Sequence, residues 1–307
     1  MPLINRILWM RPMSEPEYVR AVSVDAAVKE LANAKGDGLV IAGGTVVCTL
    51  FNQHLATPKV LIDISRIMDL REIEVSNNGG LLIGALVTHD DILRSPVIGS
   101  RAPLLTEIAE GTSCARLRNR GTIGGNLCTI GSQGDAATGL IALGAILHLR
   151  GPGGARTVPL EEFYADAFVV DLGSDELMEK IELPASLGTT RHGFCKLGPR
   201  QAMDWTQITV SVVFNSVGNL IEDIRIGMNG VSNAPIRPLP VELLLEGQEV
   251  DEVDWVNVIR TLDREISPDG DLVYSAHFKK RLAGVALRRA MERATLFNST
   301  KGNGDVG

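Results

Sequence analysis

Cysteine is scarce in this sequence, and its positions exclude several kinds of site. The 307 residues contain four cysteines, at positions 48, 114, 128 and 195, without a Cys-x-x-Cys pair. This spacing predicts neither a disulfide framework nor a cysteine-bound metal or iron–sulfur cluster, and it favours a reducing, cytoplasmic location. The five histidines do not cluster either, so they predict no metal site and no proton relay.

Long apolar runs and basic tracts are absent as well. No uncharged stretch is long enough to span a bilayer, and the N-terminal residues, interrupted by Arg6 and Arg11, offer no signal-peptide cleavage site. The net charge is −7, and no basic run is long enough to follow a phosphate backbone, so we expect no nucleic-acid partner. Hydrophobic residues, in contrast, make up 45% of the chain, which supports a large core and about two domains.

The first half of the chain alternates short apolar runs with helical patterns, which is typical of an α/β or α+β protein. Apolar residues at helical spacing predict a helix over 24–35, with Asp25 near its start as a cap. Residues 99–117 are predicted to be mostly helical. Continuous apolar runs predict buried strands at 39–44, 59–65 and 81–88.

The second half shows a different pattern, in which apolar and polar residues alternate between turn residues. This pattern predicts an antiparallel sheet with strands at 179–184, 193–198, 208–215 and 221–231. A strongly periodic helix is predicted over 276–294. We therefore expect a domain boundary near residues 172–186.

The first half contains two glycine-rich segments that are interpreted as strand exits: AGGTVV at 42–47 and GTIGGN at 121–126. Glycines lack a Cβ, so backbone N–H groups can point into one concavity that suits a diphosphate, and Thr45 and Thr122 add hydroxyl groups. Neither segment matches a P-loop or a dinucleotide fingerprint, so nicotinamide binding in a Rossmann unit is not expected. The alternative is that both segments are only tight turns.

Further segments extend this pattern and carry a resemblance to a known family. The chain resembles, over nearly its whole length, the flavin-binding medium subunits of molybdenum hydroxylases of the xanthine dehydrogenase and carbon monoxide dehydrogenase family. The segments that carry the resemblance are AGGTVVCTLFNQHLATPKVLIDISRI (42–67), IGALVTHDDIL (83–93), RNRGTIGGNLC (118–128), LIALGA (140–145), FCKLGPRQAMDW (194–205), RIGMNGVSNAPIRP (225–238) and LAGVALRRAM (282–291).

The resemblance implies an α+β fold, in which a two-part PCMH-type FAD-binding domain precedes a C-terminal antiparallel sheet with helices. The FAD-binding domain is expected over residues 1–178, split near residue 58, and the C-terminal domain over residues 179–307. The two glycine loops are expected to hold the diphosphate and ribityl chain of FAD. The residues implied at that position are Val40, Ile41, Ala42, Gly43, Gly44, Thr45, Val46, Thr122, Ile123, Gly124, Gly125 and Asn126.

Three residues outside the loops complete the expected site. The resemblance implies that Asp135 holds a ribose and that Lys196 lies beside the flavin ring, where a cation stabilises the reduced form. It also places Trp205 against the isoalloxazine. The alternatives are a surface acid, a solvated lysine and a core tryptophan. Neither a catalytic residue nor a metal ligand is expected.

The resemblance further implies that the chain acts within a larger enzyme. Electrons are expected to leave a molybdopterin cofactor on a large subunit, cross 2Fe-2S clusters on a small subunit and reach this FAD, which passes them to an external acceptor. A dimer of heterotrimers follows, and the chain alone should not turn over substrate. Two alternatives stay open: a stand-alone FAD-dependent oxidoreductase of the same flavin fold, and a scaffold subunit without flavin.

Overall fold

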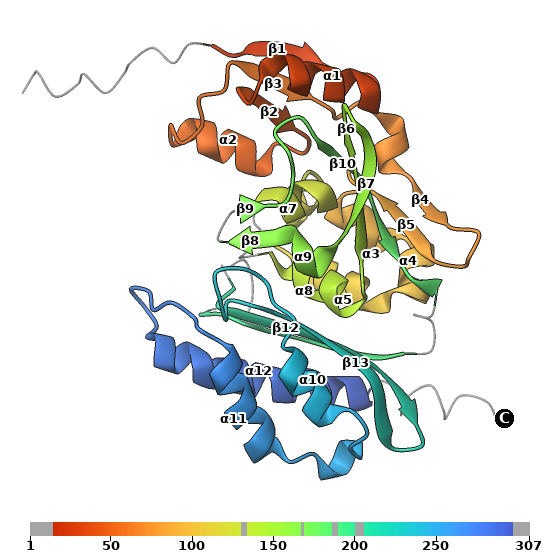
Figure 1. Cartoon of the computed structure of the whole chain (residues 1–307), viewed down its shortest axis with the longest axis vertical. Coiled ribbons are helices and arrows are strands. Elements are labelled where there is room, and N and C mark those ends of the chain that lie inside the picture. The colour runs from red at the N-terminus through yellow and green to blue at the C-terminus, as the bar shows by residue number, and fades with distance from the viewer. Residues whose placement is uncertain (1–14, 130–133, 167–168, 186–189, 200–205, 297–307) are drawn as a thin grey trace, which may run out of the picture.

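The computed structural model describes residues 15–129, 134–166, 169–185, 190–199 and 206–296. In these ranges the chain forms three units along its longest axis, each built around its own sheet (Figure 1). An N-terminal unit with a parallel sheet lies at one end, a unit with a five-stranded antiparallel sheet lies in the middle, and a three-stranded antiparallel sheet with helices forms the other end. No helix of the described ranges combines the length and apolarity that crossing a membrane requires.

The N-terminal unit has the parallel strand order β1-β3-β2. Its helix α1 buries Ala27, Val28 and Leu31, as the apolar spacing predicts. The cap differs from the prediction: the Ser23 side chain accepts the Ala26 N–H, whereas the predicted cap, Asp25, lies in the first turn. The elements of this unit are β1 (Glu17–Arg20), α1 (Val24–Ala34), β2 (Gly38–Ile41), α2 (Thr45–Asn52) and β3 (Val60–Asp63).

The central unit has the antiparallel strand order β4-β5-β10-β6-β7. Its strands are β4 (Ile73–Val75), β5 (Leu81–Gly84), β6 (Ile146–Gly151), β7 (Gly154–Pro159) and β10 (Leu177–Leu183), with a small pair, β8 (Tyr164–Asp166) and β9 (Val169–Val170), beside them. Its helices are η2 (Met68–Arg71), α3 (His89–Arg94), α4 (Pro96–Arg101), α5 (Pro103–Gly111), α6 (Ala115–Arg118), α7 (Ile123–Thr129), α8 (Asp135–Ala142) and α9 (Leu160–Phe163).

Strand β10 corrects one prediction. The strand expected at 179–184 was assigned to the second-half sheet, but it pairs with β5 and β6 of the central unit instead. Ile181 and Leu183 are fully buried there among the apolar residues of the central core, and this burial holds the strand in that sheet. Residue 179, where the sequence places the start of the second domain, therefore lies inside a strand of the central sheet.

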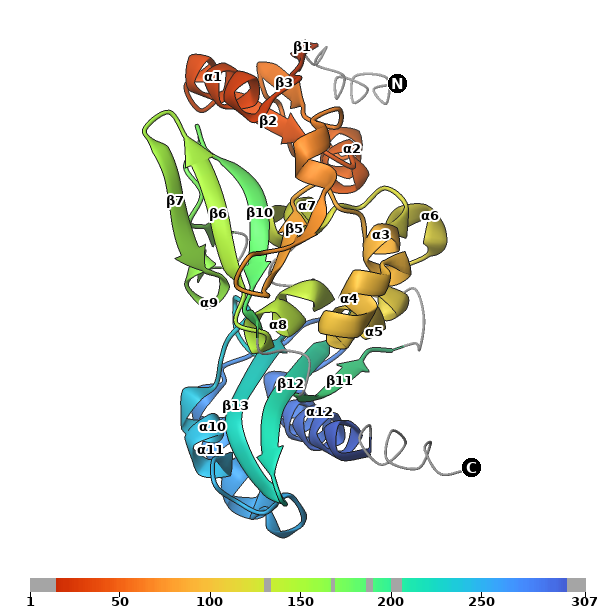
Figure 2. The ribbon, with the colours of Figure 1, turned by 90° about the vertical axis from the view of Figure 1, so that its right-hand side faces the viewer.

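The C-terminal unit has the strand order β11-β12-β13. Alternate residues of β12 face opposite sides of the sheet. Thr209, Ser211 and Val213 face α8 and the central core. Val210, Val212 and Phe214 face the other way and belong to the core that includes α12. Figure 2 shows the sheet between these two helices. The elements are β11 (Arg191–Leu197), β12 (Ile208–Val217), β13 (Leu220–Asn229), α10 (Leu239–Leu245), η4 (Val250–Glu252), α11 (Trp255–Glu265) and α12 (Ala276–Leu296).

Helix α8 joins the central and C-terminal units through backbone contact. A Cβ on Gly227 of β13 would lie 2.0 Å from the carbonyl oxygen of Thr138, so the helix rests directly on the strand. The Thr138 hydroxyl also lies 2.8 Å from the Ser211 hydroxyl of β12. Both hydroxyl-bearing residues are fully buried, so the bond between them satisfies groups that have no access to water.

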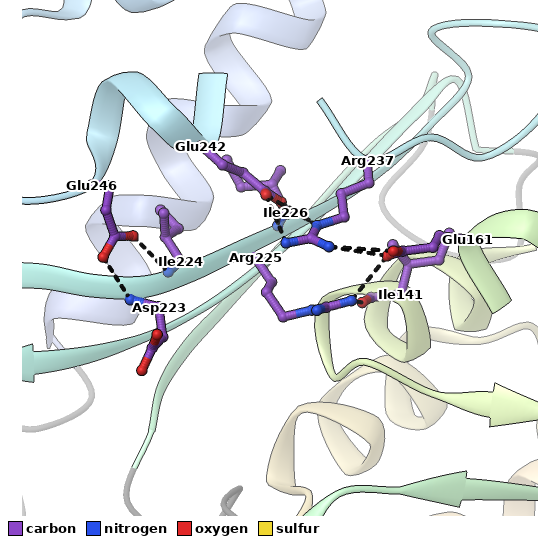
Figure 3. Close-up of polar contacts among 9 residues, drawn as sticks. All are labelled: Ile141, Glu161, Asp223, Ile224, Arg225, Ile226, Arg237, Glu242 and Glu246. Atoms are coloured by element: carbon purple, nitrogen blue, oxygen red, sulfur yellow. Dashed lines mark hydrogen bonds and ion pairs between the residues drawn. The ribbon is translucent and has the colours of Figure 1, made fainter. Parts of the chain in front are cut away.

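Charged side chains fasten the C-terminal end of α8 (Figure 3). Arg225 of β13 donates to the Ile141 carbonyl at 3.4 Å and to the Glu161 carboxylate of α9 at 2.9 Å. Arg237 bridges the same Glu161, at 3.3 Å, to Glu242 of α10, at 3.0 Å. The guanidinium of Arg225 thus lies near the negative end of a helix while it pairs with a carboxylate, and both contacts favour it.

The contact at Gly227 predicts a large effect of one methyl group. We expect Gly227→Ala to destabilise the protein by about 3 kcal/mol, because the backbone of α8 has to move away from β13. Gly153→Ala is the matched control, since a Cβ at Gly153 would meet nothing within 4 Å. Urea unfolding of both variants measures the difference; equal unfolding midpoints would show that α8 is not seated on Gly227.

Candidate functional site

The two glycine-rich loops lie against each other, although 77 residues separate their contact points. Gly43 packs on the backbone of Arg120 so closely that a Cβ would lie 1.8 Å from the Arg120 carbonyl oxygen. In return, Arg120 Nε donates to the Gly43 carbonyl at 3.4 Å. The structure therefore brings together two segments that the sequence singled out separately, one from the N-terminal unit and one from the central unit.

The first loop leads into α2. Gly44 caps this helix at φ 78°, in the left-handed region that glycine adopts without strain. The first intrahelical bond runs from Cys48 N–H to the Gly44 carbonyl at 3.0 Å, so the N–H groups of Thr45 and Val46 precede it and have no acceptor within the helix. The start of α2 is half-buried. It provides backbone donors and the positive end of a helix dipole, which suit an anionic group.

The second loop leads into α7, and part of it is fastened within the protein. The N–H groups of Ile123 and Gly124 donate to carbonyls near the end of β5, at 2.8 and 3.0 Å, and the N–H of Gly125 donates to the Thr122 hydroxyl at 3.2 Å. The amide oxygen of Asn126 is buried without a hydrogen-bond partner in the described part of the chain. A buried acceptor of this kind favours a ligand with a donor group.

The expected ribose ligand, Asp135, is engaged inside the protein. Its carboxylate accepts from Lys196 Nζ at 2.5 Å, from the Thr206 hydroxyl at 2.9 Å and from the Thr209 hydroxyl at 2.8 Å. The side chain is 6% exposed. Asp135 is the first residue of α8, where a negative charge is favoured by the helix dipole.

Lys196 extends from β11 of the C-terminal unit into the central unit. Besides Asp135, it contacts the carbonyl of Gly111 at 3.2 Å, at the end of α5. Asp135 and Lys196 are therefore brought together, although the resemblance implies separate roles for them. Those roles, with ribose and with the flavin ring, stay predictions. Trp205 lies outside the described residues.

His89 is a buried titratable group next to these loops. It is 4% exposed and packs against Gly121. Burial lowers the pKa of His89 to about 4, the nearby Asp135 carboxylate raises it, and the Arg118 guanidinium lowers it. The imidazole is therefore uncharged at neutral pH and adds no positive charge to the loops.

Sequence reasoning missed two arginines next to the first loop. Arg66 and Arg71 line a cavity together with Gly43 and Arg120. A signal for them existed: β2 and β3 are parallel neighbours, so the segments after both strands emerge at the same edge of the sheet. Ligands of parallel sheets bind at this carboxyl edge.

The site fits the diphosphate of a flavin dinucleotide. Gly43 and Gly125 lack the Cβ that would meet the Arg120 carbonyl or the Thr122 hydroxyl, so the backbone there packs closely, and the N–H groups at the start of α2 have no acceptor within the helix. Together, the three sheets and the paired loops define a two-part FAD-binding protein with a separate C-terminal domain.

Comparisons with known proteins agree with this class. Residues 12–186 match the family described as the FAD-binding domain in molybdopterin dehydrogenase, and residues 194–294 match the C-terminal domain of carbon monoxide dehydrogenase flavoprotein. The chain belongs to this family of FAD-binding subunits of molybdopterin dehydrogenases. The match covers more than half of the chain and confirms the resemblance inferred from the sequence.

Individual relatives align over nearly their whole length. The chain is 32% identical to the carbon monoxide dehydrogenase medium chain of Hydrogenophaga pseudoflava over 278 residues, which cover 91% of this chain and 96% of the relative. It is 29% identical to the glyceraldehyde dehydrogenase medium chain of Sulfolobus acidocaldarius over 282 residues, 91% of this chain and 99% of the relative. A solved carbon monoxide dehydrogenase from Hydrogenophaga pseudoflava superposes with a TM-score of 0.88 and 31% identity, over 92% of this chain and 97% of that one.

The burial of the pair between Asp135 and Lys196 predicts strong coupling between them. In flavin-depleted protein we expect Asp135→Asn and Lys196→Met each to lower the free energy of unfolding by about 3 kcal/mol, because each leaves a desolvated partner. The loss of unfolding free energy in the double variant should be smaller than the sum of the two single losses, by about 2 kcal/mol.

The control for this cycle is the pair of Asp37 and Lys59, which has the same 2.5 Å distance but side chains that are 52% and 78% exposed. We expect its coupling to be much weaker, because both side chains are solvated. Equal couplings for the two pairs would show that Asp135 and Lys196 do not stabilise the junction.

Burial of His89 predicts acid sensitivity. The folded pKa of about 4 lies below the ordinary value of 6.5, so the unfolded chain binds the proton first as the pH falls. Above pH 6.5, His89 is uncharged in both states and does not lower the free energy of unfolding. By pH 4, its protonation in the unfolded chain lowers the free energy of unfolding by about 3 kcal/mol. His89→Gln should flatten the dependence of the free energy of unfolding on pH in this window, whereas His277→Gln, at an exposed position, should not.

Proposed function

We propose that this chain is the electron-exit subunit of a heteromeric molybdenum hydroxylase. In this role it receives electrons from 2Fe-2S clusters on a small partner subunit and passes them to an external acceptor. The observation that carries the proposal is the contact between the two glycine loops, because it brings the backbone donors at the start of α2 next to the second glycine loop, which belongs to a different unit.

Different segments of the chain would bind different parts of FAD. The start of α2 and the loop at Thr122 to Asn126 would bind the diphosphate and ribityl chain, with the unpartnered Asn126 oxygen as an acceptor. Lys196, held by Asp135, places a positive charge where the central and C-terminal units meet. When bound, FAD supplies the ability to take up electrons singly and to release them singly or in pairs. The backbone and side chains of the two glycine loops would orient the bound FAD.

The names of the relatives support the proposed partners. Two of them are called medium chains, of carbon monoxide dehydrogenase and of glyceraldehyde dehydrogenase, and both align with at least 90% of this chain. We propose a large subunit with a molybdopterin cofactor, a small subunit with the 2Fe-2S clusters, and a dimer of such heterotrimers. We place the assembly in the cytoplasm, on the strength of the scattered cysteines.

The test is reconstitution. The purified chain should release one FAD per chain into the supernatant after acid precipitation, because the loops hold it without a covalent bond. Dithionite should reduce the bound flavin, but no aldehyde, heterocycle or carbon monoxide should do so. Flavin reduction by substrate should appear only after the molybdenum and iron–sulfur subunits are added.

Three results contradict the proposal in different ways. A chain purified without flavin, and unable to take it up, would be a scaffold. Yellow colour retained in the acid pellet would indicate a covalent flavin. Substrate turnover by the isolated chain would show a stand-alone oxidoreductase.

A further inference from the structure

The hairpin between β4 and β5 ends in a tip, Ser76 to Gly80, that contains an exposed Asn-Gly pair. The Gly79 N–H donates to the Ser76 carbonyl at 2.8 Å, and the Ser76 N–H donates to the Gly80 carbonyl at 2.9 Å. Gly79 has φ 83°, in the left-handed region, so the tip is a tight turn that continues into a glycine. Asn78, just before this glycine, is exposed to water.

The side chain of Asn78 is held against the backbone of the tip. Its amide oxygen accepts one hydrogen bond from the Ser76 hydroxyl and another from the Gly80 N–H, the latter at 3.0 Å. Both donors therefore point at the oxygen that becomes negatively charged when a nucleophile adds to the amide carbon. Donors placed in this way stabilise such a transition state.

We propose that Asn78 is a site of spontaneous deamidation, with the backbone nitrogen of Gly79 as the nucleophile. A bond forms between this nitrogen and Cγ of Asn78, while the bond between Cγ and Nδ2 breaks. The amide leaves as ammonia and takes the proton of the Gly79 N–H. Water then opens the five-membered imide at either carbonyl, which gives aspartate or, through attack on the backbone carbonyl, isoaspartate. The reaction consumes only water and transfers no electrons.

The nitrogen of Gly79 has to be released before it can react, because its N–H donates to the Ser76 carbonyl. Glycine adopts either sign of φ without a steric penalty, so the peptide between Asn78 and Gly79 can rotate. Water replaces the lost hydrogen bond at this exposed tip, which keeps the net cost small. The next peptide stays in place, since Arg101 Nη1 donates to the Gly79 carbonyl at 2.8 Å.

A second Asn-Gly pair, at Asn229 and Gly230, provides the comparison, whereas the pair at 303–304 lies outside the described residues. Asn229 is 3% exposed, and its Nδ2 donates to the Gly134 carbonyl at 3.3 Å. A Cβ on Gly230 would lie 1.8 Å from the Gln207 carbonyl oxygen, so the backbone there has no room to rotate. We therefore expect Asn78, but not Asn229, to react in the folded chain.

The experiment follows both pairs in the purified full-length chain, since the reaction requires neither flavin nor partner subunits. Folded chain and chain unfolded in guanidinium chloride are incubated at mildly alkaline pH in water enriched in heavy oxygen, and are then digested in ordinary water. Mass spectrometry of the peptides measures the loss of each amide, and the heavy-oxygen label separates this reaction from deamidation during digestion. Labelling by an isoaspartate methyltransferase detects the isoaspartate product.

The variant is Ser76→Ala, which removes one of the two donors to the Asn78 oxygen. The matched control is Ser174→Ala, which removes a hydroxyl from an exposed position elsewhere in the central unit. Circular dichroism checks that both variants fold.

In the folded chain we expect Asn78 to react at least about tenfold faster than Asn229, because the buried pair reacts only after the core opens. Ser76→Ala should slow the reaction of Asn78 by about threefold to tenfold, the effect of one hydrogen bond, whereas Ser174→Ala should leave the rate unchanged. In the unfolded chain both pairs should react, and Ser76→Ala should have no effect.

The proposal is overturned if Asn78 keeps its amide in the folded chain while the unfolded chain loses it, because the turn would then protect the pair. It is also overturned if folded Ser76→Ala reacts as fast as folded Ser174→Ala, because the placed donors would then play no part. Neither result depends on whether the chain binds FAD or partner subunits, so the test is independent of the proposed function.

Discussion

The architecture depends on backbone surfaces that touch without side chains between them. Gly43 against the Arg120 carbonyl joins the N-terminal and central units, and Gly227 against the Thr138 carbonyl joins the central and C-terminal units. Gly193 of β11 repeats the arrangement, since its Cβ would lie 1.9 Å from the Ala290 carbonyl of α12. Interiors are close-packed, so each junction permits little adjustment. The first of these contacts also fixes how far apart the two glycine loops are, and thereby the width of the candidate site.

Charged groups then fix the orientation that the close contacts permit. Helix α8 is fastened at its start by the pair of Asp135 and Lys196 and at its end by Arg225, which also holds Glu161. A buried ion pair adds little net stability, but a buried charge without its partner destabilises the protein strongly. Such pairs therefore favour the one docking geometry in which both partners meet.

Local patterns predicted much of the fold. The helix expected over 276–294 is α12, and three of the strands expected in the second half form the C-terminal sheet. The position of β10 was wrong because alternation identifies a strand but not its neighbours, and the partner strands lie about 30 and 100 residues earlier. The glycine loops were found because missing side chains are visible in sequence. The pair of Asp135 and Lys196, 61 residues apart, was not, because no periodicity links such distant residues.

With the proposed roles of the second loop and of Lys196, helix α8 would couple flavin binding to domain docking. The second loop leads through α7 into the same chain segment that ends in α8, and Asp135 at the start of α8 holds Lys196 of the C-terminal unit. A ligand that orders the loop and approaches Lys196 makes contacts on both sides of the junction, so its binding energy adds to the stability of docking. By the same linkage, weakening the junction lowers the affinity for the ligand, even when no residue of the glycine loops is changed. On the proposed role of Lys196, the C-terminal sheet would therefore contribute to flavin affinity through its contact with α8.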